Sequence, residues 1–397
     1  MNMQSILNQN FKNKRVLVRC DFNVPLKRGK VLDDFKIRRT LPTIDFLRKQ
    51  EAKIILLSHL GQPKPGIVRH SNKDSLKPIV QYLSRCLGVK VYFYKNYKGQ
   101  RITRRTKKLK AGQIILLENL RFFPGETKND LNFARDLAKL GDVYVSEALS
   151  VCHRSHASIV LLPTLLPSYL GLDFEKEYNF LQKLSQSPQS PFVCIIGGAK
   201  FESKLKAVKY FLEKADHVLL GGKSANVLLI TKGYSFAESV AAWQRRDLAS
   251  LKSISMANAK LHLPLDLVVS PKADKSLYQR TTGPAAVRRD EIILDIGKET
   301  AQVFAEIIGT AKTIFWAGVM GFVEDEKCTI GTKAILRAIA LNKEALKVAG
   351  GGETIAFIRK YNLESRFDFL LTGGGASLDF LSGKELPGLK ALQRPGL

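Results

Sequence analysis

Residues 346–360, LKVAGGGETIAFIRK, carry the pattern around which the rest of the chain can be understood. A short apolar run ends in three glycines at 350–352, and an acid and a hydroxyl then open a helical pattern. Glycine lets the backbone turn sharply and bring its N–H groups close to a ligand, because no Cβ stands in the way. The helix that follows would point unpaired N–H groups and the positive end of its dipole toward the same place. The stretch therefore predicts a phosphate-binding turn, with Glu353 and Thr354 placed to meet a metal ion and a phosphate oxygen.

The same module, an apolar run followed by a polar or glycine-rich loop and a helical stretch, recurs along the chain. The first half contains RVLVRC, KIILLSHL, QIILLENL and DVYVSEAL. The second half contains FVCIIGG, DHVLLGG, LDLVVS, EIILDIG, TIFWAG, LKVAGG and FDFLLTGG. Apolar runs of this length that alternate with helices predict parallel strands covered on both faces. We therefore expect an α/β protein with two doubly wound, Rossmann-like parallel-sheet domains, since 397 residues are many for one core.

A helical segment separates the two halves. Residues 169–186, YLGLDFEKEYNFLQKLSQ, predict a helix, and the polar breaker SPQSP follows it. We expect an N-terminal domain over residues 1–170, a linker helix and hinge over 171–190, and a C-terminal domain over 191–384. Two domains that each hold one reactant, with a cleft between them that closes to exclude water, are typical of a transferase.

Composition limits the class of protein. Hydrophobic and charged contents of 45% and 25% are ordinary for a globular chain. The five cysteines are scattered and show no CxxC or Cys/His metal spacing, which predicts reduced thiols. The N-terminal residues lack the apolar core of a secretion signal, and the apolar stretch 159–172 is interrupted by two prolines. We expect a cytoplasmic protein without a membrane partner.

The net charge of +27 is the unusual bulk property. It would suit nucleic acid, an anionic membrane surface or acidic small-molecule substrates. The densest basic segment, residues 95–110, contains no acid. Because no aromatic stacking pair or RNA-binding motif accompanies it, a solvated basic face is the interpretation that we favour. Nucleic acid remains the less favoured partner.

The loops that follow the predicted strands fall into two chemical sets. Those of the first half carry Asp21, Asn23, His59, Arg121 and Arg154, whereas those of the second half read GGAK, GGKS, GGGE and GGGA. In parallel sheets ligands bind beyond the carboxyl ends of the strands. The first set would suit a small anion and the second would offer glycine backbone to phosphates. Each loop alone could be a plain turn, such as an Asx turn at Asp21, but successive strand ends with such residues favour a site.

Lys200 and Lys204 lie four residues apart at the start of a predicted helix, so they would share a face. Two like charges there repel each other and oppose the positive end of the helix. An anion between them would remove the penalty, which favours a phosphate site. The alternative is two lysines that diverge into solvent.

Taken together, the motifs resemble the phosphoglycerate kinase family. The similarity runs from RVLVRCDFNVP through LPTIDFL, SHLG, LLENLRF, HRSH, GGAK, TIFW, GTKA and GGGET to TGGGASLDFLSGKELPG. The resemblance implies two doubly wound domains, with the C-terminal tail at 385–397 folded back on the first. It also implies a glycolytic kinase, a cytosolic monomer that transfers a phosphoryl group between 1,3-bisphosphoglycerate and Mg-ADP to give 3-phosphoglycerate and ATP.

The resemblance assigns roles to residues of this chain. Those that would hold the phosphoglycerate are Asp21, Asn23, Lys36, His59, Gln62, Arg121 and Arg154. Those that would hold the nucleotide are Lys200, Lys204, Glu324, Gly350, Gly351, Gly352, Glu353 and Thr354. Glu353 would also face Mg²⁺, and the residues that act in the transfer itself would be Lys36, Lys204 and Arg154. Catalysis of this kind rests on positioning and on neutralisation of charge by cations, Mg²⁺ and backbone N–H groups.

Several positions depart from the family's pattern. The family has arginine where Lys36 and Gln62 stand and aspartate where Glu353 stands, and its NDAFGTAHR reads SEALSVCHR here. Lysine keeps the charge but loses the bidentate fork, and glutamine loses a charge-assisted hydrogen bond of about 1.5–3 kcal/mol. Glu353 is one methylene longer beside a metal that tolerates little distortion. We expect an active kinase with reduced turnover; the alternatives are an inactive member kept as a nucleotide- or phosphoglycerate-binding protein and an RNA-binding protein that uses residues 95–110.

Overall fold

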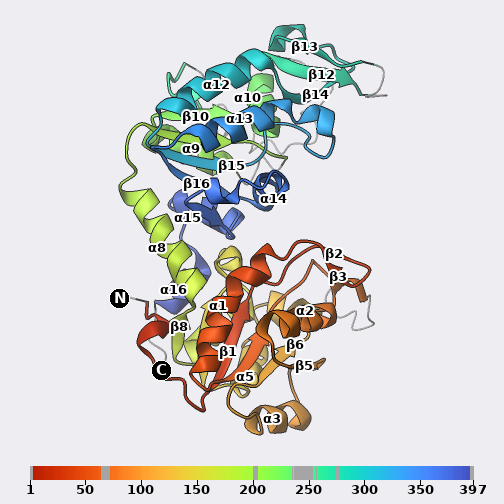
Figure 1. The fold of residues 1–397 in the computed structure, drawn as a ribbon, viewed down its shortest axis with the longest axis vertical. Coiled ribbons are helices and arrows are strands. Elements are labelled where there is room, and N and C mark those ends of the chain that lie inside the picture. Colours follow the sequence, from red (N-terminus) through yellow and green to blue (C-terminus); the bar gives the residue numbers. More distant parts are fainter. Residues whose placement is uncertain are drawn as a thin grey trace. The chain divides into compact units, whose positions relative to one another are not determined.

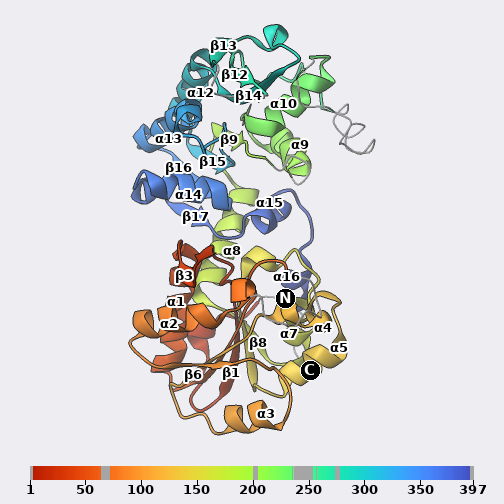
Figure 2. The same ribbon diagram turned by 90° about the vertical axis from the view of Figure 1, so that its right-hand side faces the viewer.

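The computed structural model describes residues 3–63, 72–199, 204–234, 236, 254–255, 257–272 and 278–393. The chain forms two compact units, shown in Figures 1 and 2. The first unit comprises Met1–Gln182 and Glu385–Leu397, and the second comprises Lys183–Lys384. Each unit is built around one six-stranded sheet.

The sheet of the first unit is parallel throughout, as the sequence predicts. Its strands, in spatial order, are β5 (Val91–Tyr94), β6 (Ile114–Leu117), β4 (Lys53–Leu57), β1 (Arg15–Cys20), β7 (Val143–Glu147) and β8 (Ser168–Leu170). Successive residues of β1 such as Val16 and Leu17 are both fully buried, because the sheet is covered on both faces. The two outer strands, β5 and β8, are short and were not among the predicted runs.

The remaining elements of the first unit surround this sheet. The longer helices are α1 (Phe35–Lys49), α2 (Lys77–Leu87), α3 (Gln100–Lys107), α5 (Leu131–Ala138) and α8 (Leu172–Gln186). The last four residues of α8 belong to the second unit. The short elements are the hairpin strands β2 (Leu26–Lys27) and β3 (Lys30–Val31) and the helices α4 (Pro124–Thr127), α6 (Ala157–Val160), α7 (Leu162–Leu165) and α16 (Pro387–Leu392). Apolar residues of α1 and α2, such as Ile44 and Leu83, pack on the same core as Val18 and Leu56 of the sheet. The last helix, α16, returns to this unit, where the N–H of Gly388 donates to the carbonyl of Cys152 at 2.9 Å.

The main sheet of the second unit is also parallel. Its spatial order is β11 (Leu261–His262), β10 (His217–Leu220), β9 (Phe192–Ile196), β15 (Thr313–Ala317), β16 (Leu346–Gly350) and β17 (Phe369–Leu371). Its helices are α9 (Leu205–Lys214), α10 (Gly222–Thr231), α12 (Lys298–Thr310), α13 (Ile330–Leu341), α14 (Gly352–Lys360) and α15 (Gly375–Leu381). The prediction of a doubly wound α/β fold is therefore confirmed.

The prediction of parallel pairing was wrong for two of the apolar runs, LDLVVS and EIILDIG. They form β12 (Leu267–Pro271) and β14 (Glu291–Ile296), which pair antiparallel in a separate three-stranded sheet with β13 (Arg280–Thr282). A parallel connection needs a long crossover, usually a helix. Between these strands the described chain holds only β13 and one short 3₁₀ turn, Pro284–Ala286, so it folds back on itself. An apolar run looks the same in either type of sheet.

In both six-stranded sheets the chain first adds strands on one side of the first strand and then on its other side. In the first unit β1 lies between β4 and β7, and in the second β9 lies between β10 and β15. The loops that leave such a pair of strands diverge to opposite faces and open a crevice at their carboxyl ends, where ligands bind. The two crevices therefore locate the candidate site in each unit. Among the residues that the structure describes, no helix is long and apolar enough to cross a membrane.

The start of α8 is held by Glu147, the last residue of β7. Its buried carboxyl group accepts hydrogen bonds from the Thr43 hydroxyl at 2.7 Å and from the backbone N–H groups of Asp173 and Phe174 at 3.1 and 3.3 Å. Burial, with a contribution from the charge of Asp173, raises the pKa of Glu147 to about 8.

This raised pKa predicts that the free energy of unfolding falls as the pH rises from about 5 to about 8. In the unfolded chain Glu147 loses its proton near its ordinary pKa of 4.5, whereas in the folded chain it keeps the proton up to about 8. The folded state therefore binds more protons across this window. Urea unfolding at several pH values measures the slope. Glu147→Gln should flatten it and the exposed control Glu51→Gln should not; equal slopes in all three proteins would contradict the assignment.

Candidate active site

Asp21 is the centre of the site in the first unit, directly after β1. The Lys36 ammonium lies 2.6 Å from its Oδ2, and the Ser150 hydroxyl donates to the same oxygen. The backbone N–H of Asn23 donates to Oδ1 at 2.9 Å. Burial opposes ionisation of Asp21, but the charge of Lys36 and the hydrogen bonds from Lys36 and Ser150 outweigh it and hold the pKa of this carboxyl well below its usual range. Asp21 is therefore a fixed anion that positions Lys36.

Arg19 lies beneath this centre and was not among the predicted site residues. It is fully buried in β1, where its Nε donates to the Ser158 hydroxyl at 2.9 Å and its Nη1 donates to the carbonyl of Cys20 at 2.6 Å. Its Nη2 lies 3.4 Å from Nδ1 of His59. Burial lowers the pKa of His59 well below its usual range, so His59 is a neutral hydrogen-bonding group at pH 7. An arginine inside the apolar run RVLVRC was the one sequence signal for this position.

Arg121 holds a donor ready for a ligand. It lies in the short turn Leu120–Phe122 after β6 and is 8% exposed. Its Nη1 donates to the carbonyl of Gly61 at 2.7 Å, whereas its buried Nε has no hydrogen-bond partner in the described part of the chain. Burial, together with the charges of Arg19 and Arg154, lowers the pKa of Arg121 to about 10. It stays protonated at neutral pH, and an incoming anion would satisfy its free donor.

The structure brings the predicted residues of the first unit together. The Asn23 side chain accepts the N–H of Gly61 at 2.9 Å, which joins the loop after β1 to the loop after β4. Asn23, Gln62 and Arg154 are exposed, whereas His59 is buried. We call six of these residues the anion cluster, because we expect them to bind an anion: Asp21, Asn23, Lys36, His59, Arg121 and Arg154. Three of the six are cationic and one is acidic. Gln62, beside Gly61, lies next to the anion cluster.

Lys204 occupies the corresponding crevice of the second unit. Its ammonium donates to the carbonyl of Gly197 and, at 3.3 Å, to that of Ala317. These two carbonyls stand at the ends of β9 and β15, the strands between which the sheet reverses. The structure places Lys204 at the N-cap of α9, outside the helix on which the prediction had placed it. Lys200, the predicted partner of Lys204, lies outside the described residues.

The glycine turn at 350–352 closes the same crevice. β16 ends at Gly350, Gly351 adopts a φ of 96° that disfavours side chains, and α14 begins at Gly352. Thr354 is fully buried, and its Oγ1 accepts the N–H of Gly318 at 2.7 Å, so it ties this turn to the turn after β15.

Glu353 and Lys204 meet at Gly198. A Cβ added to Gly198 would lie 2.8 Å from the Lys204 ammonium and 3.4 Å from Oε2 of Glu353. Glycine at this position thus lets an acid and a cation approach the same point beside the backbone. The turn at 350–352 and the loop after β9 therefore converge, which sequence spacing alone did not establish.

A cavity of about 350 Å³ opens beside this point. It is lined by Glu324 and Glu353, by glycine backbone at Gly198, Gly222 and Gly321, and by apolar side chains that include Leu294, Met320 and Phe322. A lining that combines polar groups with apolar side chains suits a ligand that has both a charged part and a flat apolar part. We call it the second-unit cavity.

Comparisons with known proteins match these features along nearly the whole chain. The family model described as phosphoglycerate kinase matches residues 6–384. The chain belongs to the phosphoglycerate kinase family.

Named relatives and solved structures of this family cover the chain almost completely. The phosphoglycerate kinase of Borrelia garinii subsp. bavariensis is 40% identical over 386 residues, 97% of each chain. That of Pelotomaculum thermopropionicum is 41% identical over 384 residues, 96% of each chain. Among solved structures, phosphoglycerate kinase from Coxiella burnetii has a TM-score of 0.82 at 34% identity and covers 98% of this chain and 99% of its own. The one from Pyrococcus horikoshii has a TM-score of 0.85 at 33% identity and covers 98% of each.

The structure connects two of the departures from the phosphoglycerate kinase pattern. Ser150 stands where the family's NDAFGTAHR has glycine, in the turn Leu149–Val151 after β7. Its hydroxyl and the Lys36 ammonium bind the same oxygen of Asp21. The two departures therefore meet at one carboxylate. The sequence alone gave no reason to connect them, because they lie more than a hundred residues apart.

Gly318 should be the glycine of the second unit that tolerates alanine least. Its φ is 108°, and a Cβ there would overlap the carbonyl oxygen of Gly197 and the Lys204 ammonium. We expect Gly318→Ala to lower the free energy of unfolding by at least about 1–3 kcal/mol, measured by urea unfolding. In Gly352→Ala, the control, the new Cβ would meet no described atom within 4 Å, so a neutral or slightly positive change is expected. Equal losses in both variants would disprove the role of close packing at Gly318.

Proposed function

We propose that this chain, a phosphotransferase by family, catalyses transfer of a phosphoryl group between 1,3-bisphosphoglycerate and ADP, giving 3-phosphoglycerate and ATP. The observation that carries the proposal is the chemistry of the two crevices, one in each unit. The first presents cations at strand ends, and the second presents glycine backbone and one lysine. In the transfer, the bond from phosphorus to the acyl oxygen breaks as a bond to the terminal ADP oxygen forms. Such a reaction needs positioning and charge neutralisation rather than a protein nucleophile.

The anion cluster would hold the phosphoglycerate. A carboxylate and a phosphate on a three-carbon body need cationic donors, and Arg121 and Arg154 supply them. Asp21 and Asn23 carry oxygens that can accept from the substrate hydroxyl. Lys36, held by Asp21, would place its remaining N–H donors toward the transferred group. His59, which is neutral, would serve as a hydrogen-bonding group rather than a charge.

The nucleotide would occupy the second unit. The backbone N–H groups at the start of α14, around Gly351 and Gly352, can bind phosphate oxygens, and Thr354 fixes this turn. The Lys204 ammonium would neutralise charge on the phosphates, and Glu324 would reach a ribose hydroxyl at the edge of the second-unit cavity. Lys200 is proposed for the phosphates from the sequence alone.

The residues of this unit fit a Mg²⁺ ion that arrives with the nucleotide. Mg²⁺ is commonly bound through one or two carboxylates plus substrate phosphates and waters. Glu353 supplies one exposed carboxylate at the rim of the second-unit cavity. No group of three or more metal-ligating side chains occurs among the described residues. We therefore propose that Glu353 faces the metal, which would supply neutralisation of phosphate charge when bound.

We further propose that the protein acts as a cytoplasmic monomer on small-molecule substrates. The proposed functional domains are residues 1–170 with the tail 385–397 for phosphoglycerate, and 191–384 for the nucleotide, joined by a linker helix within 171–190. The reason is that each set of ligand-binding loops leaves a single sheet. Nucleic acid is not part of this proposal.

Replacement of Lys204 tests the nucleotide site. Lys204→Ala should lower kcat/KM at least ten- to a hundredfold, since one charge-assisted contact contributes about 1.5–3 kcal/mol. A coupled assay of ATP formation from ADP and 1,3-bisphosphoglycerate measures it. Lys206→Ala, on the exposed side of α9, removes the same charge and should keep the wild-type rate. Full activity of Lys204→Ala would refute the site, and no turnover by the unaltered chain would refute the function.

Reversion of the departures tests the phosphoglycerate site. If Lys36 and Gln62 weaken catalysis, Lys36→Arg and Gln62→Arg should each raise kcat/KM, because each adds bidentate or charged contacts to the transferred or bound phosphate. The expected gain is about tenfold or more. Arg38→Lys, on the exposed side of α1 and paired with Asp34, is the control and should leave kcat/KM unchanged. Unaltered or lower rates in both reverted proteins would show instead that Ser150 and Asp21 have adapted the site to Lys36.

A further inference from the structure

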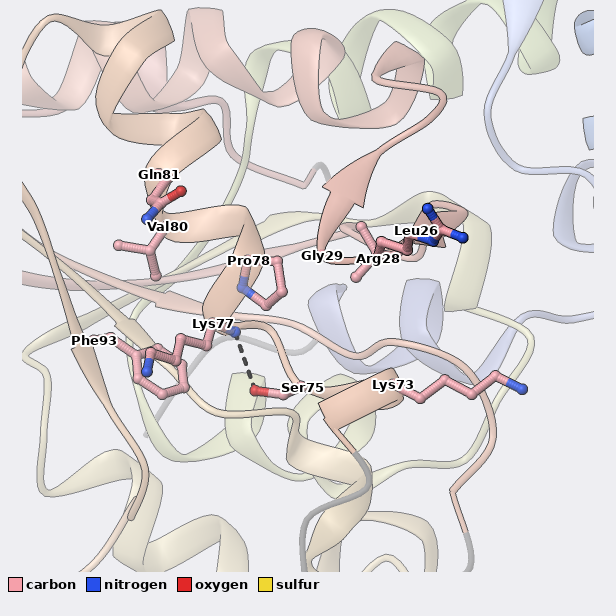
Figure 3. A pocket seen from close by; sticks show the side chains of 10 residues that line it. All are labelled: Leu26, Arg28, Gly29, Lys73, Ser75, Lys77, Pro78, Val80, Gln81 and Phe93. Carbon is pink, nitrogen blue, oxygen red and sulfur yellow. Dashed lines mark hydrogen bonds between the residues drawn. The ribbon is translucent and has the colours of Figure 1, made fainter.

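A hollow of the first unit is formed by the β2–β3 hairpin, the start of α2 and the edge strand β5 (Figure 3). It measures about 800 Å³, and its lining includes Arg28, Lys73 and Lys77. Figure 3 shows that these three side chains end apart from one another, so no single group of a ligand can contact all of them. Side chains from distant segments converge instead at Asp21.

Three segments that are far apart in the sequence meet at the Asp21 carboxylate. Asp21 follows β1, Lys36 is the second residue of α1, and Ser150 lies in the short turn after β7. The Lys36 ammonium, at 2.6 Å, and the Ser150 hydroxyl contact the same oxygen, Oδ2. The backbone N–H of Asn23 donates to the other oxygen, Oδ1, at 2.9 Å. Asp21 and Ser150 are 5% and 9% exposed, so water has little access to these contacts.

Lys36 offers Asp21 fewer donors than an arginine would. A guanidinium is a planar fork that can donate two parallel N–H groups to one carboxylate, whereas an ammonium is a compact charge on a flexible stem. The family pattern has arginine at position 36 and glycine, which brings no side-chain donor, at position 150. Both positions differ in this chain. The Ser150 hydroxyl therefore gives the carboxylate the second side-chain donor that lysine does not provide.

The Ser150 hydroxyl also attaches the loop that carries Arg154. The N–H of Arg154 donates to the carbonyl of Val151, the residue after Ser150, at 2.9 Å. The contact of Ser150 with Asp21 thus joins the start of this loop to the end of β1. Without the hydroxyl, Lys36 would be the one side-chain donor left to Asp21 among the residues that the structure describes, and its flexible stem would let the ammonium turn away.

We propose that Ser150 is a positioning residue for phosphoryl transfer, which acts with Lys36 as a pair in place of one arginine. The proposal rests on the function proposed above. The Ser150 hydroxyl holds Asp21, and Asp21 holds the Lys36 ammonium toward the transferred group. No bond to Ser150 forms or breaks in the reaction. Because this kind of catalysis depends on positioned cations, a displaced Lys36 lowers the rate of transfer rather than the binding of the nucleotide.

Steady-state kinetics of four proteins test the pairing: the unaltered chain, Ser150→Ala, Lys36→Arg and the double variant. Ser150→Ala removes only the hydroxyl and should lower kcat for ATP formation at least about threefold. The KM for ADP should not change, because the proposed ADP site lies in the second unit. In the Lys36→Arg chain the same substitution should change kcat less than about twofold, because a guanidinium can supply the second donor itself. Equal losses of kcat in both backgrounds would overturn the pairing and leave the proposed function in place.

Urea unfolding of the same four proteins gives a readout that does not need turnover. Ser150→Ala should lower the urea midpoint more in the unaltered chain than in the Lys36→Arg chain. Ser155→Ala, the control, removes a hydroxyl from an exposed residue of the same loop and should change neither kcat nor the midpoint. If the unaltered chain gave no turnover, the proposed function would be refuted, and the midpoints would decide the pairing: equal shifts in both backgrounds would overturn it.

Discussion

The candidate site of the second unit depends on one contact, that of the Lys204 ammonium with two backbone carbonyls at strand ends. Lys204 donates to the carbonyls of Gly197 and Ala317, which lie on neighbouring parallel strands that lead into loops on opposite sides of the sheet. Ligands bind beyond the carboxyl ends of such strands. The Ala317 carbonyl also accepts the N–H of Gly197 at 3.1 Å, and the ammonium that contacts both carbonyls leaves positive charge at the crevice. The glycines around it are required because the ammonium, the backbone and Glu353 occupy the space that side chains would need.

In the first unit an acid, rather than a lysine, lies at the strand end where the sheet reverses. Asp21 stands at the end of β1, where its sheet reverses, and its carboxylate gathers Lys36, Ser150 and the N–H of Asn23. Because Asp21 stays ionised, it orients Lys36 as a fixed partner. Arg19 and the free donor of Arg121 add positive charge beneath and beside it. A surplus of oriented cations in a partly buried crevice is the physical basis for binding a doubly charged substrate.

The sequence by itself determined the strands and the chemical character of the loops behind them. RVLVRC, KIILL and TIFWA are buried strands because continuous apolar runs between helices demand burial on both faces, and the glycine turn at 350–352 follows β16 as expected. Only the tertiary structure decided the pairing of β12 with β14, the burial of Arg19, the meeting of Ser150 with Asp21 and the carbonyl contacts of Lys204. The hydrophobic pattern indicates how deeply a segment is buried. The pairing and the contacts just named depend instead on which distant segments become neighbours. Which segments become neighbours is decided by the assembly of the whole sheet, and the local sequence pattern does not indicate it.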